Sequence, residues 1–216
     1  MPAEHVLLLH GLCRSTRSLM RMSAALSDAG FVPHCISYPS RSASIEQLAD
    51  SALPPAVRRC EEAGAGAIHF VTHSMGGILV RSYLRRHPHP PLLGRVVMLA
   101  PPNHGSEIVD RLRHWRLFQQ INGAAGQELG TGADSTPQRL GAADFETGIL
   151  AGRRSLDWFF SAFFFSGPND GKVSVESTRL EGMRDHRVLP ATHTFITRNA
   201  AAIRQTIHFL RHGRFV

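Results

Sequence analysis

The chain has 216 residues, of which 43% are hydrophobic and 19% are charged, a balance typical of a folded globular protein rather than a disordered one. This length suits one α/β domain and is shorter than the size at which chains usually divide, so we expect a single domain over residues 1–216. The formal net charge is +7, but the basic residues are mostly scattered arginines without a stripe of interleaved aromatics, which argues against nucleic-acid binding.

Membrane spans, disulfide frameworks and metal sites are also disfavoured. No apolar run approaches the roughly 18 residues of a transmembrane helix. The run at 6–9 is too short for the hydrophobic region of a signal peptide, so we expect a cytoplasmic protein. Cys13, Cys35 and Cys60 are an odd number without metal-ligand spacing, so we expect buried free thiols and no metal.

Short apolar runs alternate with longer segments of helical periodicity, which is typical of a parallel sheet with crossover helices. Six strands are predicted, at 6–9, 32–37, 67–72, 95–100, 148–151 and 187–189. Their nearly continuous hydrophobicity is typical of strands that are covered on both faces. The predicted helices are 15–29, 44–63, 75–87 and 194–211. We expect Pro54 and Pro55 to kink or split the second helix, because proline removes a helical hydrogen bond.

The interval 101–146 differs in composition from the rest of the chain. It is rich in Gly, Asn, Gln and Asp, and it contains one amphipathic piece at about 108–121. A plain loop of this length is uncommon in a compact domain. We therefore predict an inserted cap over about 103–146.

The sequence THSMGG at 72–77 carries the strongest chemical signal, because it lies directly between a predicted strand and a predicted helix. A sharp strand-to-helix turn exposes the hydroxyl of Ser74 and needs small neighbours, a demand that Gly76 and Gly77 meet. The start of the helix also directs free N–H groups at the place where negative charge develops. The alternative is a serine that only caps the helix.

A second signal is His10-Gly11-Leu12, directly after the first predicted strand. Because the carboxyl ends of parallel strands face one crevice, this turn and Ser74 should meet there. The backbone N–H groups of Leu12 and Met75 would then bind the oxyanion of a tetrahedral intermediate. The alternative is a glycine turn beside a solvated histidine.

Together these motifs resemble the α/β-hydrolase superfamily, and within it the short bacterial lipases and esterases. The resemblance runs from residue 6 to about 195 and rests on HG at 10–11, THSMGG at 72–77, APPN at 100–103, NDG at 169–171 and His193. It implies an α/β-hydrolase fold with a minimal, mostly parallel sheet of about six strands, flanking helices and a cap. It also implies a catalytic triad of Ser74, Asp170 and His193. Thr72 departs from the family, whose turn usually opens with glycine.

The predicted acid and base also agree with the order of elements along the chain. The acid must hold the imidazole in the tautomer that accepts the serine proton, so it should lie on a loop after a late strand, as Asp170 does. His193 follows the last predicted strand and precedes the last helix. Asp157 and Asp185 are weaker candidates for the acid, and a role confined to an Asx turn is the alternative for Asp170.

The predicted substrate-binding residues are His10, Gly11, His73, His104, Phe159 and Phe160. The first four lie close to the motifs in sequence. The last two belong to an aromatic run at 158–165, which is either an apolar acyl pocket or lipid-facing rim, or ordinary core packing.

These features predict a serine hydrolase that cleaves carboxylic esters through an acyl-enzyme, without a metal or organic cofactor. Its partner would be a small-molecule acyl ester or a lipid, with transient contact to a membrane or lipid surface. The alternatives are an amidase, thioesterase or acyltransferase with the same triad, and a non-catalytic lipid-binding protein that keeps the fold.

Overall fold

The computed structural model describes residues 2–156, 163–165 and 167–216. In these residues a six-stranded sheet has the order β2-β1-β3-β4-β5-β6, and every neighbouring pair of strands runs parallel. The strands are β1 (Glu4–Leu9), β2 (Val32–Ile36), β3 (Ala67–His73), β4 (Leu93–Leu99), β5 (Thr147–Gly152) and β6 (Asp185–Leu189). The expected α/β-hydrolase fold, with about six strands, is confirmed.

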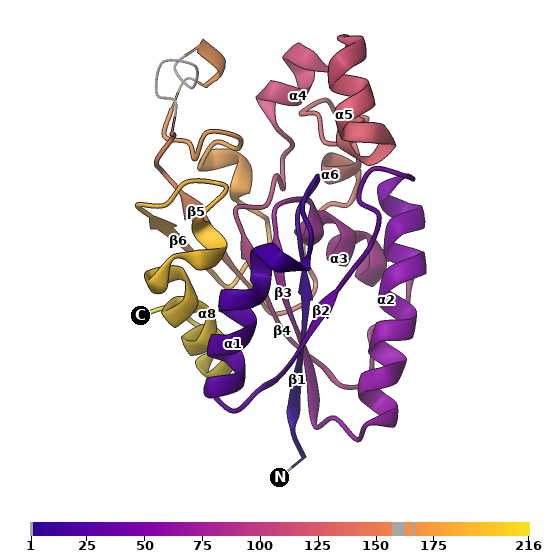
Figure 1. Cartoon of the computed structure of the whole chain (residues 1–216), viewed down its shortest axis with the longest axis vertical. Helices are drawn as coiled ribbons and strands as arrows, with labels where there is room; N and C mark the ends of the chain where they lie inside the picture. The colour runs from indigo at the N-terminus through magenta and orange to yellow at the C-terminus, as the bar shows by residue number, and fades with distance from the viewer. Residues whose placement is uncertain (1, 157–162, 166) are drawn as a thin grey trace.

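Helices cover both faces of the sheet (Figure 1). One face carries α1 (Met20–Asp28) and α8 (Ala200–His212), and the other carries α2 (Ile45–Glu62) and α3 (Met75–Arg86). The other helical segments among the described residues are η1 (Thr16–Leu19), α4 (Glu107–Leu112), α5 (Arg116–Gln127), α6 (Thr136–Arg139), η2 (Glu176–Thr178) and η3 (Ile196–Arg198).

The side chains of β1 alternate between the two layers, as the two-residue period of a strand dictates. Leu7 and Leu9 belong to the cluster beneath α2 and α3, whereas Val6 and Leu8 belong to the cluster beneath α1 and α8. All four are fully buried. Burial of each such side chain stabilises the fold by about 1.5–3 kcal/mol, which explains why the strand is apolar at every one of these positions.

The turns that follow β1 and β3 lie side by side at the carboxyl edge of the sheet. The chain leaves β1 towards β2 on one side and returns to β3 on the other, and parallel sheets bind their ligands at such a reversal of strand order. Leu9 pairs with Thr72 at the ends of the two strands. The turn after β1 comes so close that a Cβ on Gly11 would lie 3.1 Å from the Cβ of Ser74.

α2 runs as one helix through Pro54 and Pro55, so of the two predicted outcomes, a kink or a split, the split does not occur. The helix begins at a capping box in which Ser44 and Gln47 each accept the other's backbone N–H. Its inner face, including the fully buried Leu53, packs into the core. Tertiary packing of this face stabilises the helix despite the two missing backbone donors.

Two other predicted helices, and the amphipathic piece of the predicted cap, are divided in the structure. The segment 15–29 forms η1 and α1, and the amphipathic piece at 108–121 forms parts of α4 and α5. The last helix begins only at Ala200, because the Asn199 side chain accepts the N–H groups of Ala201 and Ala202 and caps it there.

The predicted cap segment contains α4, α5 and α6, and α4 and α5 stand above the carboxyl ends of the strands (Figure 1). Among the described residues, no helix is both long enough and apolar enough to span a membrane. All three cysteines are free, and Cys60 is buried and Cys35 half-buried as single thiols. Cys13 is exposed, because it lies in the turn after β1, so the expectation of burial is wrong for it.

Candidate active site

Ser74 occupies the sharp turn from β3 into α3. Its backbone φ of 54° and ψ of −125° lie in a region that residues with a Cβ rarely adopt, at a cost of about 1–3 kcal/mol. The turn is held by hydrogen bonds from Ser74 N to the carbonyl of Leu99 (2.8 Å) and from Gly77 N to the carbonyl of Ser74 (2.9 Å). A Cβ on Gly76 would lie 2.8 Å from the carbonyl oxygen of Leu9, so only glycine fits there.

Thr72 stands where the family's turn usually opens with glycine, and a second glycine makes room for it. The Thr72 side chain is fully buried, and its Oγ1 would lie 3.2 Å from a Cβ on Gly77. The absence of a side chain at position 77 therefore accommodates the larger residue at position 72.

Ser74, His193 and Asp170 form one buried chain of hydrogen bonds. Ser74 Oγ lies 3.0 Å from His193 Nε2, and His193 Nδ1 lies 2.8 Å from Asp170 Oδ2. Because an ionised carboxylate can only accept, Nδ1 carries the proton and Nε2 is left to accept the hydroxyl proton of Ser74. The structure thus brings together, from three distant parts of the chain, the residues that the sequence predicts as nucleophile, base and acid.

The two carboxylate oxygens of Asp170 have separate partners. Oδ1 accepts the backbone N–H groups of Lys172 (3.0 Å) and Val173 (2.9 Å), and Oδ2 faces His193. The backbone carbonyl of Asp170 also accepts the N–H of His193, at 3.0 Å. Asp170 is therefore an Asx-turn residue and the partner of the imidazole at once, and the turn fixes the direction in which Oδ2 points.

His73 supports the same site from the residue before Ser74. Its Nε2 donates to the backbone carbonyl of His193 at 2.9 Å, and the two rings are 5.0 Å apart between centroids. Burial, followed by the nearby charge of His193, lowers the pKa of His73 well below its ordinary value. The His73 imidazole is therefore neutral at neutral pH, and it holds the backbone of His193 without adding charge.

The two predicted oxyanion donors, the backbone amides of Leu12 and Met75, belong to the turns that meet at Ser74. Met75 is the first residue of α3, and the first N–H groups of a helix have no carbonyl partner within it. Leu12 follows Gly11, the residue in close approach to Ser74, and lines the same cavity as Ser74.

Ser74 and His193 open into a cavity of about 300 Å³ beneath α4 and α5. Its polar lining includes Arg14, Asn122 and Lys172. Its apolar lining from this segment is Ile108, Val109, Leu112, Phe118 and Leu129. The cavity is thus mostly apolar, as sites for small organic ligands usually are.

The predicted substrate-binding residues are only partly gathered at this cavity. Gly11 and His73 line it. His10 does not, because its buried ring stacks on Tyr38 with 4.2 Å between centroids, and His104, whose side chain is exposed, does not line the cavity either. Phe159 and Phe160 lie outside the described residues, as do Trp158 and Asp157.

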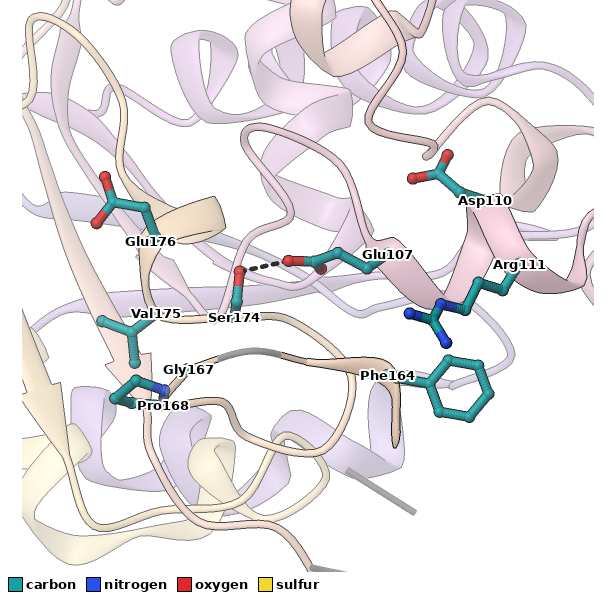
Figure 2. A pocket seen from close by; sticks show the side chains of 9 residues that line it. All are labelled: Glu107, Asp110, Arg111, Phe164, Gly167, Pro168, Ser174, Val175 and Glu176. Carbon is teal, nitrogen blue, oxygen red and sulfur yellow. Dashed lines mark hydrogen bonds between the residues drawn. The ribbon is translucent and has the colours of Figure 1, made fainter. Parts of the chain in front are cut away.

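A larger hollow of about 640 Å³ lies against the opposite face of α4 (Figure 2). There Ser174 Oγ donates to Glu107 Oε1 at 2.9 Å, and the Arg111 guanidinium lies 5.5 Å from the ring centroid of Phe164. The triad residues Ser74, Asp170 and His193 are not among those that line this hollow, so its size does not make it the reaction site.

Two residues that support the site are absent from the sequence predictions. Arg81 is a buried side chain of α3 that donates to Asn103 O (3.1 Å), Asn103 Oδ1 (3.2 Å), Pro137 O (3.0 Å) and Gly141 O (2.7 Å), and burial lowers its pKa to about 10. The position of this arginine within the mostly apolar sequence ILVRSYL could have indicated that its side chain is buried and paired. Gly152 ends β5, where a Cβ would lie 2.8 Å from the Cβ of Asp170.

Comparison with known proteins agrees with this architecture. The mature form of Bacillus licheniformis lipase BlEst2 has 22% sequence identity and a TM-score of 0.71, with 96% of this chain and 89% of that one covered. Its propeptide form has 21% identity and a TM-score of 0.74, with 90% of this chain covered but only 47% of the longer one. The metagenomic carboxyl esterase MGS0156 has 17% identity and a TM-score of 0.70, with 91% and 66% covered. At these identities the likeness shows a shared fold.

A search of curated proteins found no match to this chain. The sequence model of the alpha/beta hydrolase family, in contrast, matches residues 6–211, nearly the whole length. This match agrees with the strand order, the strained turn at Ser74 and its hydrogen bond to His193. The chain therefore belongs to the alpha/beta hydrolase family.

Proposed function

We propose that the protein is a carboxylic ester hydrolase that works through an acyl-enzyme. His193 accepts the proton of Ser74 as the hydroxyl oxygen attacks the ester carbonyl, and Asp170 stabilises the resulting imidazolium. The alcohol leaves with that proton, and water then cleaves the acyl-enzyme with His193 again as the base. The observation that carries the proposal is the continuous chain of hydrogen bonds from Ser74 Oγ to Asp170 Oδ2.

The charge that develops on the carbonyl oxygen would be held by the amides of Leu12 and Met75. Such a donor typically stabilises the transition state by about 3 kcal/mol, because it is already oriented before the charge appears. The position of Met75 at the start of α3 adds the positive end of the helix dipole.

We further propose that the substrate is a water-insoluble ester met at a lipid surface. Trp115, Leu117 and Ile121 are 64%, 65% and 47% exposed on and beside α5, the helix whose Phe118 lines the cavity. An exposed apolar cluster of this kind beside a binding cavity favours contact with an apolar surface. The cavity volume is at the lower end for small-molecule sites, which favours short acyl chains over long ones.

The experiment is a panel of p-nitrophenyl esters of graded chain length, with matched p-nitroanilides and acyl thioesters. We expect turnover of the esters with a preference for short chains, and labelling of Ser74 by a fluorophosphonate. Faster cleavage of the anilide or thioester would replace the ester assignment. If neither wild type nor Ser74→Ala releases product and both bind the same lipid equally, the non-catalytic alternative holds.

The lipid-surface contact is tested with emulsified tributyrin against dissolved p-nitrophenyl acetate. We expect the double variant Trp115→Ser, Leu117→Ser to lose activity on the emulsion and keep it on the dissolved ester. Val216→Ser removes an apolar side chain that is also 65% exposed, and it should change neither activity. Equal loss on both substrates would contradict a surface role for the cluster.

A further inference from the structure

Two imidazoles and a thiol converge on the α2 side of the sheet, remote from Ser74. His5 comes from β1, His34 from β2 and Cys60 from α2. One nitrogen or sulfur atom from each residue lies within 4.8 Å of the other two. His34 Nε2 and His5 Nδ1 are 3.1 Å apart. The proposed ester hydrolysis uses none of these groups.

Strand register explains why the three residues meet. His34 pairs with Leu7 and His5 pairs with Val32, so the two histidines are diagonal neighbours on β1 and β2. Leu7 and Cys60 share the apolar cluster on the α2 side, which places His5 on that face too, two residues from Leu7. The three donors thus come from two strands and the helix that covers them.

This cluster is remote from the proposed catalytic residues Ser74, His193 and Asp170. His5 lies near the amino end of β1, whereas Ser74 follows the carboxyl end of β3. About 13 Å of strand, at roughly 3.3 Å per residue, separates His5 from Leu9 at the other end of β1. The side chains between the two places belong to the packed core.

We propose that His5, His34 and Cys60 form a binding site for a zinc ion. Imidazole nitrogen and thiolate sulfur are the donors that zinc prefers, and three protein ligands with water in the fourth position are a common zinc arrangement. His5 and Cys60 are 5% and 1% exposed, whereas His34 is half-buried. Water would therefore reach the ion from the side of His34.

The present spacing is close to that of a tetrahedral zinc site. Bond lengths of about 2.0–2.1 Å to nitrogen and about 2.3 Å to sulfur separate the donors by roughly 3.3–3.6 Å. The three donor atoms already lie within 4.8 Å of one another, so binding needs side-chain shifts of only about 1 Å. Without metal, the same groups make a His–His hydrogen bond beside a buried thiol.

The protonation states of the three ligands determine whether the ion must displace a proton. Burial, followed by the charges of His5 and Arg59, lowers the pKa of His34, so its imidazole is neutral at neutral pH. Burial raises the pKa of Cys60, so the thiol is protonated before the ion arrives. Zinc forms bonds to two neutral imidazoles and one thiolate, and the Cys60 proton leaves to solvent.

A bound ion would link the edge strand β2, its neighbour β1 and the helix α2 through its three protein ligands. An ion that binds only the folded state raises its stability by mass action. Because the site lies on the far side of the core, ester hydrolysis should not depend on the ion. Failure of this proposal and failure of the proposed hydrolysis are therefore distinguishable.

The test uses chelator-treated full-length protein titrated with zinc alone, and with cobalt as a spectroscopic substitute. We expect one ion per chain, a thiolate-to-cobalt charge-transfer band and a higher Tm with zinc. Cys60→Ser should remove the band and weaken zinc binding at least about 10–100-fold, which is the loss that even outer-shell partners of a metal ligand cause.

Matched variants keep the test decisive. Cys35→Ser changes a half-buried thiol outside the cluster and should preserve band, affinity and Tm shift. His34→Gln should abolish the Tm shift while circular dichroism reports a folded chain. The proposal is overturned if no stoichiometric ion binds, or if Cys60→Ser binds zinc as tightly as wild type.

Discussion

The imidazole of His73 is joined to the backbone carbonyl of His193 by a hydrogen bond of 2.9 Å that spans 120 positions of the chain. The residue before the proposed nucleophile thus anchors the loop that carries the proposed base. Because a carbonyl only accepts, Nε2 of His73 carries the proton and the ring must stay neutral to avoid a buried charge.

This neutrality predicts a loss of stability in mild acid. The pKa of His73 is well below 6.5 in the folded protein, so below pH 6.5 the unfolded chain binds a proton that the folded one does not. The free energy of unfolding should therefore fall with decreasing pH, by up to about 1.4 kcal/mol per pH unit for this residue. Urea unfolding between pH 5 and 8 measures it.

The contribution of His73 is isolated with His73→Gln, whose amide can still donate to the His193 carbonyl. We expect a shallower pH slope in this variant, while burial of His10 and His186, which also lowers their pKa, sustains part of the decline. Identical slopes in wild type and variant would mean that His73 is not held neutral.

The strained backbone of Ser74 predicts an unusual order of stability between two inactive variants. Both Ser74→Ala and Ser74→Gly should lower kcat by about 10⁶-fold, the loss expected when a serine nucleophile is removed. Glycine adopts a φ of 54° without strain, so Ser74→Gly should be the more stable of the two by about 1 kcal/mol.

A matched pair at Ser27 provides the control for this order. Ser27 is exposed within α1, where alanine is favoured over glycine by about 1 kcal/mol. The order of the two variants should therefore be reversed there. Equal stability of the two Ser74 variants in urea unfolding would show that the turn is unstrained.

Asp170 is predicted to act through the tautomer of His193. In Asp170→Asn an amide replaces the carboxylate, so the proton of Nδ1 is no longer required and Nε2 is free to become the protonated nitrogen. We expect kcat on a p-nitrophenyl ester to fall by about 10⁴-fold with little change in circular dichroism.

Asp185→Asn is the control, because Asp185 competes with Asp170 as the acid in the sequence. Its carboxylate accepts the N–H of Phe215 at 2.7 Å, next to the C-terminus. We expect kcat within about twofold of wild type, since substitutions of partly exposed residues far from the active site usually have small effects. A larger loss from Asp185→Asn than from Asp170→Asn would reassign the acid.

The sequence could predict the fold class and the proposed catalytic residues because those signals are local. The run before Ser74 is a strand, the run after it is a helix, and the tight turn between them selects Gly76 through its contact with Leu9. The order of strands then implies that turns after β1 and β3 meet, which needs no knowledge of side-chain packing.

The features that the sequence could not predict depend on contacts between segments that are distant along the chain. The helix through Pro54 survives because of core packing that no local rule for proline includes. Part of the cavity wall comes from α4 and α5; the amphipathic pattern at 108–121 predicts a helical piece there but not where it lies over the sheet. His10, which belongs to the turn motif after β1, does not reach the cavity and is instead buried beside Tyr38, because β2 returns to that side of β1.

Arg81 is predicted to stabilise the segment between β4 and β5. Arg81→Leu would leave the carbonyl oxygens of Asn103, Pro137 and Gly141 without this donor, and each orphaned buried group costs about 1–3 kcal/mol. We expect the free energy of unfolding to fall by at least about 3 kcal/mol. Arg85→Leu, one turn later and exposed, should change it by less than about 0.5 kcal/mol.

Gly152 is predicted to set the position of the acid. A Cβ at this residue would lie 2.6 Å from the carbonyl oxygen of Ala191 and 2.8 Å from the Cβ of Asp170, so Gly152→Ala must push the loop outward. A displacement of about 1 Å in a catalytic group costs about 10²-fold, so kcat should fall by that factor. Gly167→Ala is the matched control, because a Cβ there meets nothing within 4 Å, and it should leave kcat unchanged. Full activity of Gly152→Ala would show that the Asp170 loop adapts without cost to the chemistry.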